Sequence, residues 1–244
     1  MRPPLTCLLF DLDGTLVDSM SLIYASFRHT MREVLELAPS DEALLGIFGQ
    51  PLVKGLATLG GLPLDLPASL AANSHLPPVY DPGEPPEQRL MRRLLYVYRT
   101  HNLSHHDDYI KCFPGANETL NELKRRGYAL GVVTSKGQLT AVRSTARCGL
   151  DVHMDTMVVL EDTGKHKPDP TPLLLALRRP GRRPEESLYL GDAAVDVLAA
   201  RAAGTVAAAA LWGPLPREQV LALAPDYALE SIGELLQLCP RLAV

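Results

Sequence analysis

Two acidic side chains near the start of the chain stand at a spacing that can do chemistry. Asp11 directly follows the apolar run Cys7–Phe10, and Asp13 lies two positions later, just before the turn residue Gly14. The run predicts a buried strand, and open α/β sheets bind ligands at the carboxyl ends of such strands. Two like charges this close are costly to bury unless a cation or a proton lies between them. Oxygen ligands suit Mg²⁺, and a carboxylate can also attack phosphorus as a nucleophile.

Taken alone, the two acids have a plainer explanation, because Asp and Gly are common in turns for their local hydrogen bonding. Polar residues at other strand ends decide between the two explanations. Three further apolar segments predict buried strands that lead into polar side chains, and parallel strands bring their carboxyl ends to one edge of a sheet. The polar residues that follow these segments are Thr134 and Ser135, Lys167, and Asp192 with Asp196.

The elements that must position these side chains alternate between strands and helices. From residue 114 onward, short apolar segments are separated by amphipathic helical patterns, many of which end at glycine. This alternation is typical of an α/β fold with a doubly wound parallel sheet. The predicted strands are Cys7–Phe10, Tyr128–Val133, Met154–Leu160, Ser187–Leu190, Thr205–Leu211 and Asp226–Leu229.

A helical, strand-poor segment interrupts the alternation. Asp18 or Ser19 can cap its first helix, and a proline-rich stretch over residues 63–86 predicts an irregular connection within it. We therefore expect a core domain of residues 1–17 and 111–244 and an inserted helical domain of residues 18–110. The helices predicted in the insert are Ser21–Glu36, Ser40–Phe48, Pro51–Leu59 and Glu87–His101.

Length and composition exclude several classes of protein. The chain has 244 residues, 46% of them hydrophobic, so it can bury a sizeable core. Its formal net charge of −4 lacks the basic character that nucleic-acid binding requires. The four cysteines show no metal-ligand or disulfide spacing, which suits a reducing compartment. No signal peptide or membrane span is apparent, so we expect a cytoplasmic monomer or homodimer without nucleic-acid or membrane partners.

Four motifs in order resemble those of the haloacid dehalogenase (HAD) superfamily. They are DLDGT at residues 11–15, Thr134 in GVVTSK, Lys167 in KHKPDP, and GDxxxD at residues 191–196. Together they cover most of the chain outside the helical insert. The resemblance implies a Rossmann-like HAD core, and the insert just after the first motif is similar to the α-helical cap of the phosphoglycolate phosphatase-like branch.

The resemblance implies a role for the two acids of the first motif. Asp11 would attack phosphorus and carry the phosphoryl group. Asp13 would protonate the leaving oxygen and then activate the water that breaks the aspartyl-phosphate, and its backbone carbonyl would bind the metal. These roles favour phosphoryl transfer over dehalogenation, because Asp13 supplies the acid–base carboxylate.

The other motifs complete the implied site. Asp192 would complete a Mg²⁺ site with Asp11 and Asp13. Asp196 would support this site, either by binding the metal directly or by contacting one of its ligands. Lys167 would stabilise the charge of the phosphoryl oxygens, which Thr134 and nearby backbone N–H groups would hold. The alternatives are that Lys165 takes the place of Lys167, that Ser135 takes the place of Thr134, and that Asp196 is only a first-turn acid of a helix.

The insert is where substrate choice is expected. The sequence GQPLVKG, residues 49–55, resembles the cap loop that reaches the active site, which makes Gln50 and Lys54 candidate substrate-binding residues. An exposed loop with a solvated lysine is the alternative. The histidine- and aspartate-rich segment 101–108 is interpreted as a hydrated polar loop at the hinge between the domains, not as a metal site.

The resulting hypothesis is a Mg²⁺-dependent phosphoric monoester hydrolase that acts on a small phosphorylated metabolite of the phosphoglycolate type through an aspartyl-phosphate intermediate. Inorganic pyrophosphatase or sugar phosphomutase activity would use the same core, and cleavage of phosphonates would require an imine-forming lysine such as Lys54. A receiver-type signalling module also groups acids, a threonine and a lysine, but it is about half this length and has no insert. A non-catalytic interaction protein is the remaining alternative.

Overall fold

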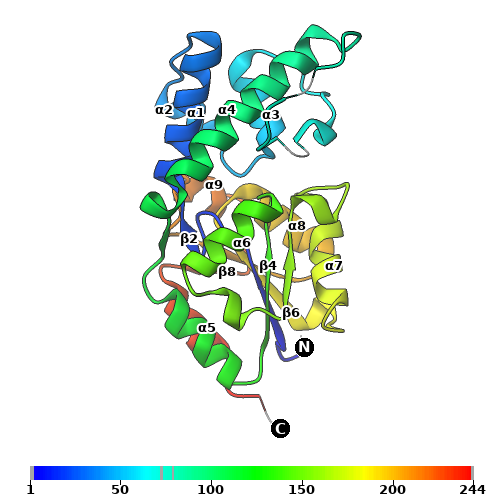
Figure 1. Ribbon diagram of the computed structural model, residues 1–244. Helices are drawn as coiled ribbons and strands as arrows, with labels where there is room; N and C mark the ends of the chain where they lie inside the picture. Colours follow the sequence, from blue (N-terminus) through cyan, green and yellow to red (C-terminus); the bar gives the residue numbers. More distant parts are fainter. Residues whose placement is uncertain (1–2, 72–73, 79, 243–244) are drawn as a thin grey trace. The chain divides into compact units, whose positions relative to one another are not determined.

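The chain folds into two compact units. The computed structural model describes residues 3–71, 74–78 and 80–242 (Figure 1). The core unit comprises Met1–Ser19 and Ile110–Val244, and the helical unit comprises Met20–Tyr109. Among the described residues, no helix combines the length and the apolar character that crossing a bilayer requires.

A six-stranded parallel sheet forms the centre of the core unit and confirms the predicted doubly wound α/β fold. The strand order is β5-β4-β1-β6-β7-β8, so the chain runs outward from β1 in both directions. The point where the order reverses, beside β1, is where this architecture opens a crevice at the carboxyl ends of the strands. The strands are β1 (Cys7–Phe10), β4 (Ala129–Val133), β5 (Thr156–Val158), β6 (Ser187–Gly191), β7 (Val206–Ala210) and β8 (Tyr227–Leu229).

The central position of β1 explains its unbroken apolar sequence. All four of its residues are buried, and Leu9 lies between Gly131 of β4 and Tyr189 of β6. A Cβ atom at Gly131 would lie 2.4 Å from Cγ2 of Thr156, so a side chain there would push β5 away. β5 itself is shorter than the predicted strand Met154–Leu160, because single 3₁₀ turns occupy both of its flanks.

Helices cover the sheet of the core unit. One face packs side chains such as Leu9, Val133 and Tyr189 against Leu173 and Ala200 of two helices, α7 and α8. The helices are α5 (Ala116–Arg125), α6 (Gln138–Arg147), α7 (Thr171–Arg178), α8 (Ala194–Ala203), α9 (Arg217–Leu221) and α10 (Leu235–Leu238). The 3₁₀ turns are η2 (Asp151–His153), η3 (Leu160–Asp162), η4 (Pro184–Glu186) and η5 (Ile232–Glu234).

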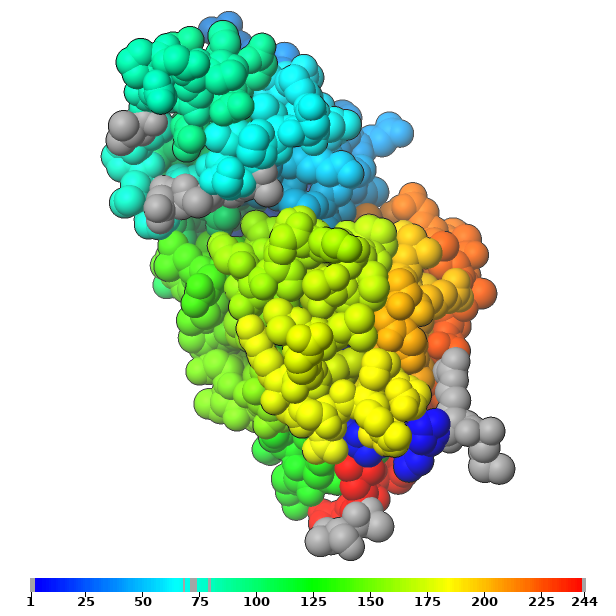
Figure 2. Space-filling view, turned by 90° about the vertical axis from the view of Figure 1, so that its right-hand side faces the viewer, coloured from blue at the N-terminus to red at the C-terminus, as the bar shows by residue number. Residues whose placement is uncertain are grey.

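The start and the end of the chain are tied to the same end of the core unit. The N–H of Thr6 donates to the carbonyl of Glu186 at 2.8 Å, and the carbonyl of Thr6 accepts from Ala129 at 3.0 Å. The N–H of Leu242 donates to the carbonyl of Arg126. Figure 2 shows the blue N-terminal residues lying between the yellow segment that precedes β6 and the red C-terminal segment.

The helical unit is built around two antiparallel partners, α1 and α4, which run side by side (Figure 1). Their apolar faces enclose Phe27, Met31, Leu94 and Leu95. A single 3₁₀ turn, η1, lies within the described part of the proline-rich stretch. The elements of the unit are α1 (Met20–Leu35), α2 (Asp41–Gly46), α3 (Leu52–Gly60), η1 (Ala68–Ala71) and α4 (Pro86–Tyr109).

The interpretation of residues 101–108 as a hydrated loop is wrong, because α4 continues to Tyr109. The rings of His101 and His105, one turn apart, stack with centroids 4.3 Å apart. Asn102 donates to the hydroxyl of Ser26 in α1 at 3.3 Å, and His106 is fully buried. Asn102 and His106 therefore serve helix packing, which composition alone does not reveal, whereas His105, Asp107 and Asp108 are exposed on the helix surface.

Where the chain leaves and re-enters the core unit, two short strands pair antiparallel. They are β2 (Val17–Asp18) and β3 (Lys111–Cys112), and Val17 stands opposite Cys112.

The histidine stack predicts a dependence of stability on pH. Burial, together with the neighbouring His29, His105 and Arg32, lowers the pKa of His101 from 6.5 to about 4. The folded state therefore favours neutral His101, so its contribution to stability is complete above pH 6.5 and is lost as the pH falls toward 4. In denaturant unfolding between pH 7 and pH 4, we expect His101→Gln to lose less stability than the wild type.

His75→Gln is the matched control, because His75 is an exposed histidine of the same unit. It should follow the wild-type curve. A His101→Gln curve parallel to that of the wild type would contradict the assignment.

Candidate active site

The carboxyl end of β1 forms one wall of the candidate site. The N–H of Asp11 donates to the carbonyl of Leu190 at 2.8 Å, which fixes the start of the loop beside β6. The loop turns at Gly14, whose φ of +85° suits a residue without a Cβ atom, and its N–H donates to the carbonyl of Val17. The loop therefore folds back on itself directly after the first two acids.

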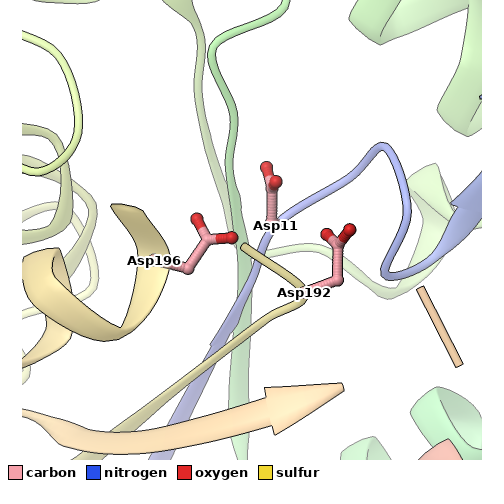
Figure 3. A group of neighbouring side chains, drawn as sticks. All are labelled: Asp11, Asp192 and Asp196. Carbon is pink, nitrogen blue, oxygen red and sulfur yellow. The ribbon is translucent and has the colours of Figure 1, made fainter. Parts of the chain in front are cut away.

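Three carboxylates meet at this strand end. Carboxylate oxygens of Asp11, Asp192 and Asp196 lie within 4.8 Å of one another, and all three residues are buried. Figure 3 shows the group: Asp11 leaves β1, while Asp192 and Asp196 come from the end of β6 and the first turn of α8. Residues 181 positions apart in the sequence thus form one acidic cluster, as the strand-end argument requires.

Lys167 is the cation of the cluster. Its Nζ lies 3.0 Å from Oδ1 of Asp11 and 2.6 Å from Oδ1 of Asp196, and it donates to the hydroxyl of Tyr189 at 2.9 Å. Only 3% of its side chain is exposed, whereas 67% of the Lys165 side chain is exposed. Of the two lysines that the sequence offers, Lys167 is the one that enters the site.

The electrostatics of the cluster favour proton or cation binding. Burial raises the pKa of Asp11 to about 7, because the lowering effect of Lys167 only partly offsets it and Asp196 raises it further. Burial also raises the pKa of Asp192 well above its ordinary value, with Asp196 and Asp11 adding to the effect. For Lys167, burial lowers the pKa, but the two carboxylates outweigh burial and the net shift is upward.

The surroundings of Asp192 fit a small cation with oxygen ligands. Its Oδ1 accepts a hydrogen bond from the Thr15 hydroxyl at 3.0 Å, while its buried Oδ2 has no hydrogen-bond partner among the described residues. A Cβ atom at Gly14 would lie 2.3 Å from Oδ2, and one at Gly213 would lie 2.4 Å from Cβ of Asp192. The absence of side chains at the two glycines leaves room beside the Asp192 carboxylate. The carboxylates of the cluster offer only oxygen ligands, which Mg²⁺ prefers.

Asp196 has two local partners besides the acids. Its Oδ2 accepts from the backbone N–H of Ala193 at 3.0 Å, which caps the first turn of α8. Its Oδ1 accepts from both Lys167 and Tyr189. It is therefore a first-turn acid of a helix and also the residue that orients the lysine.

Asp13 lies beside the carboxylate cluster with a separate set of partners. Its Oδ1 accepts from the Ser19 hydroxyl at 2.6 Å and from Nζ of Lys136 at 2.7 Å. Ser19, which with Asp18 is a predicted cap of the next helix, donates its hydroxyl proton to Asp13. These two contacts fix the direction of a carboxyl group whose chemistry depends on its orientation.

The end of β4 supplies hydroxyl groups. Thr134 is buried, and its Oγ1 accepts from the backbone N–H of Lys136 at 3.1 Å, which leaves the hydroxyl proton available. Ser135 lies next to it and is less buried. Both residues line a small cavity together with His166 and Lys167.

The two candidates in the insert have contacts of their own unit. Gln50 donates from Nε2 to the carbonyl of Gly46 at 3.0 Å. Lys54 lies in α3 with an exposed side chain. Both belong to the helical unit, Met20–Tyr109.

A family model described as "Haloacid dehalogenase-like hydrolase" matches residues 8–210. The chain belongs to this family. The match confirms the family expected from the four motifs, and it makes the chain a hydrolase of the HAD superfamily.

Individual relatives resemble the chain over nearly its whole length. The pyrophosphatase PpaX of Bacillus velezensis is 33% identical over 233 residues, which is 96% of this chain and 95% of that protein. The solved structure of a predicted phosphoglycolate phosphatase from Haemophilus somnus has a TM-score of 0.75 at 25% identity and covers 96% of this chain and 97% of its own. The solved structure of a haloacid dehalogenase-like family hydrolase from Streptococcus pneumoniae has a TM-score of 0.74, also at 25% identity, and covers 96% of this chain and 97% of its own.

Several residues of this HAD site were not assigned from the sequence. Lys136 follows the second motif by two positions, and the indole N–H of Trp212 donates to the carbonyl of Thr15 at 2.9 Å. Their roles depend on proximity in space, although the "TSK" and "ALWG" sequences mark polar or aromatic side chains at strand ends. The residues of this kind are Thr15, Lys136, Tyr189, Trp212 and Gly213.

The acidic cluster predicts that Mg²⁺ stabilises the folded protein through Asp192. At a free Mg²⁺ concentration of about 100 times the dissociation constant, binding to the folded state alone adds about 2.7 kcal/mol. Asp192→Asn keeps the acceptor for Thr15 and removes a carboxylate that is costly to ionise in the metal-free cluster. We expect it to unfold at a temperature equal to or above that of the metal-free wild type and to lose the Mg²⁺-dependent increase, as measured by calorimetry.

Asp151→Asn is the matched control, because Asp151 is an exposed aspartate of the same unit. It should keep the full response to Mg²⁺. A response of Asp192→Asn equal to that of the wild type would place the cation elsewhere.

Proposed function

We propose that the protein is a Mg²⁺-dependent phosphatase that removes a phosphoryl group from a small phosphorylated molecule through an aspartyl-phosphate. The observation that supports this most directly is the position of Asp11. Its carboxylate lies 3.0 Å from the Lys167 ammonium and in one cluster with Asp192. A nucleophile, a cation for the phosphoryl charge and a metal ligand thus occur together at one strand end.

In the proposed reaction, a carboxylate oxygen of Asp11 attacks phosphorus, and the bond from phosphorus to the leaving oxygen breaks. Asp13 gives its proton to that oxygen. Asp13 then accepts a proton from water as the water attacks the aspartyl-phosphate, which releases phosphate and restores Asp11. Ser19 and Lys136 hold the carboxyl group of Asp13 in one orientation during both steps.

The phosphoryl oxygens would be held from two sides. Lys167 supplies a fixed charge, and its contacts to Asp196 and Tyr189 keep the ammonium group from turning away. Thr134 offers its hydroxyl proton, with Ser135 and the neighbouring backbone N–H groups beside it.

The metal would be held by Asp11, Asp192 and the backbone carbonyl of Asp13. When bound, Mg²⁺ supplies positive charge that offsets the repulsion between the anionic substrate and the carboxylates. Asp196 supports this site through Lys167.

The helical unit is proposed to act as the cap over the core domain, with residues 1–17 and 111–244 as core and residues 18–110 as cap. In this proposal Gln50 and Lys54 contact the leaving group of the substrate. The side-chain carbonyl oxygen Oε1 of Gln50 is buried without a hydrogen-bond partner among the described residues, which supports a role in binding a donor.

The four cysteines are free thiols, which supports a cytoplasmic location.

Inorganic pyrophosphate is a second candidate substrate beside a phosphoglycolate-like monoester. The relative from Bacillus velezensis, at 33% identity over 96% of the chain, is named a pyrophosphatase. The structural relative from Haemophilus somnus, at 25% identity, is named a predicted phosphoglycolate phosphatase. Comparing kcat/KM for pyrophosphate, phosphoglycolate and sugar phosphates decides between them, since the core chemistry is the same for all three.

Replacing the nucleophile should abolish turnover. Asp11→Asn keeps the size of the side chain but removes the attacking charge, so we expect kcat for p-nitrophenyl phosphate with Mg²⁺ to fall by a factor of about 10³ or more. Asp151→Asn should retain full activity.

Two other outcomes distinguish the remaining protein classes. A receiver-type module would give at most stoichiometric phosphorylation of wild-type protein by a small phosphodonor, without turnover. A non-catalytic protein would give neither phosphorylation nor turnover. Absence of turnover by the wild type, with or without phosphorylation, would reject the proposed phosphatase activity.

Lys136 should matter through Asp13. Lys136→Met removes the charged hydrogen bond at 2.7 Å, and the loss of such a bond costs about 1.5–3 kcal/mol, or roughly 10- to 100-fold in rate. We expect this loss in kcat at saturating substrate, with a smaller change in KM, because Asp13 acts on the leaving group and on water. Lys165→Met, which alters an exposed lysine, is the control and should leave both constants unchanged.

A further inference from the structure

Two cysteines of the core unit, Cys112 and Cys148, lie beside the same asparagine, Asn117, and are not part of the acidic cluster. Cys112 belongs to β3 and is half-buried, and Cys148 directly follows α6 and is 9% exposed. The other two cysteines, Cys7 and Cys239, are fully buried in the core.

Asn117 holds the two cysteines together. Its Nδ2 donates to the carbonyl of Cys148 at 2.6 Å and lies 3.9 Å from Sγ of Cys112. Its Oδ1 is in turn bonded to the His153 ring at 3.1 Å. One amide group, itself fixed, therefore contacts both cysteines.

The two thiols are not equivalent. The thiol of Cys148 donates to Cys112, which lowers the pKa of Cys112 despite its partial burial. The same hydrogen bond raises the pKa of Cys148. Cys112 is therefore the thiol that ionises first and also the one that solvent reaches, and these two properties make a cysteine reactive.

We propose that Cys112 and Cys148 form an oxidation site for peroxides, whose product is an intramolecular disulfide. The thiolate of Cys112 attacks one oxygen of hydrogen peroxide, the O–O bond breaks, and the products are a sulfenic acid and water. Cys148 then attacks the sulfenic sulfur, the S–S bond forms, and the hydroxyl group leaves as a second water. Two thiols lose two electrons and two protons in total, and the peroxide accepts both.

The position of Cys112 links this site to the loop that follows β1. Cys112 stands opposite Val17 in the β2–β3 pair, and the carbonyl of Val17 accepts the N–H of Gly14. A disulfide would therefore fix the strand on which the chain returns to the core unit. The inference is independent of the proposed phosphatase activity, and its test does not use that activity.

The test treats the full chain with hydrogen peroxide, blocks the remaining thiols, and maps the peptides by mass spectrometry without reduction. The expected product of the wild type is a cross-linked pair of peptides that contain Cys112 and Cys148, with the mass of two hydrogen atoms lost. Free thiols should fall from four to two, and dithiothreitol should restore all four. Cys239→Ser should give the same product.

Two variants separate the roles of the thiols. Cys148→Ser should stop at the sulfenic acid of Cys112, detected with a dimedone probe, and Cys112→Ser should show no fast reaction. Oxidation of the wild type to a sulfinic acid at Cys112 without a cross-link, or a cross-link between other cysteines, would overturn the proposal. Because the wild-type peptide map decides it, a variant that fails to fold leaves the conclusion unaffected.

Discussion

The burial of three carboxylates around one ammonium group is the constraint on which the site depends. Lys167 contacts Asp11 and Asp196 directly, while Asp192 keeps a buried oxygen without a hydrogen-bond partner among the described residues. Burial and mutual repulsion raise the pKa values of Asp11 and Asp192. In water the same acids would ionise without cost, so it is the fold that creates the affinity for a proton or a cation. The candidate chemistry, whether metal binding or phosphoryl transfer, uses this imbalance of charge.

The order of the strands in the sheet, together with a few small residues, places the acidic groups and Lys167 close together. β1 lies between β4 and β6, so the loop after Asp11 has neighbouring strand ends on both sides. Small residues then allow close approach: glycine at position 131 admits Thr156, and glycine at position 213 leaves room for Asp192. The hydrogen bonds of the loop to Leu190 and Trp212 tie it to β6 and to the segment after β7. The geometry of the site is thus a consequence of strand order and of a few missing side chains.

Sequence patterns predicted the parts of the structure that depend on local properties. Apolar runs located the six strands of the sheet, and Asp11, Thr134 and Asp192 were found because each directly follows a strand. Lys167 lies further along its loop and was chosen from its KHKPDP sequence. The contact of Lys136 with Asp13 was not predicted, because Lys136 lies two positions beyond the strand-end residue Thr134 and the direction of its side chain depends on the fold of that loop. The end of α4 was misjudged for a related reason: the polar residues near His101 are satisfied by α1, and composition cannot distinguish a neighbouring helix from water. The helical unit is where local patterns said least about function.

The two carboxylate oxygens of Asp196 have separate hydrogen-bonding roles, and this affects how sequence variation among relatives should be interpreted. One oxygen of this carboxylate closes the first turn of α8, and the other holds an ammonium group in the site. A substitution would therefore loosen a helix terminus and release a buried charge in a single step. Selection for folding alone would then preserve an acid at this position even in a homologue that had lost its catalytic activity. Invariance of Asp196 across a family tree is consequently poor evidence for metal ligation, whereas loss of Asp192 beside a retained Asp196 would mark an inactive descendant.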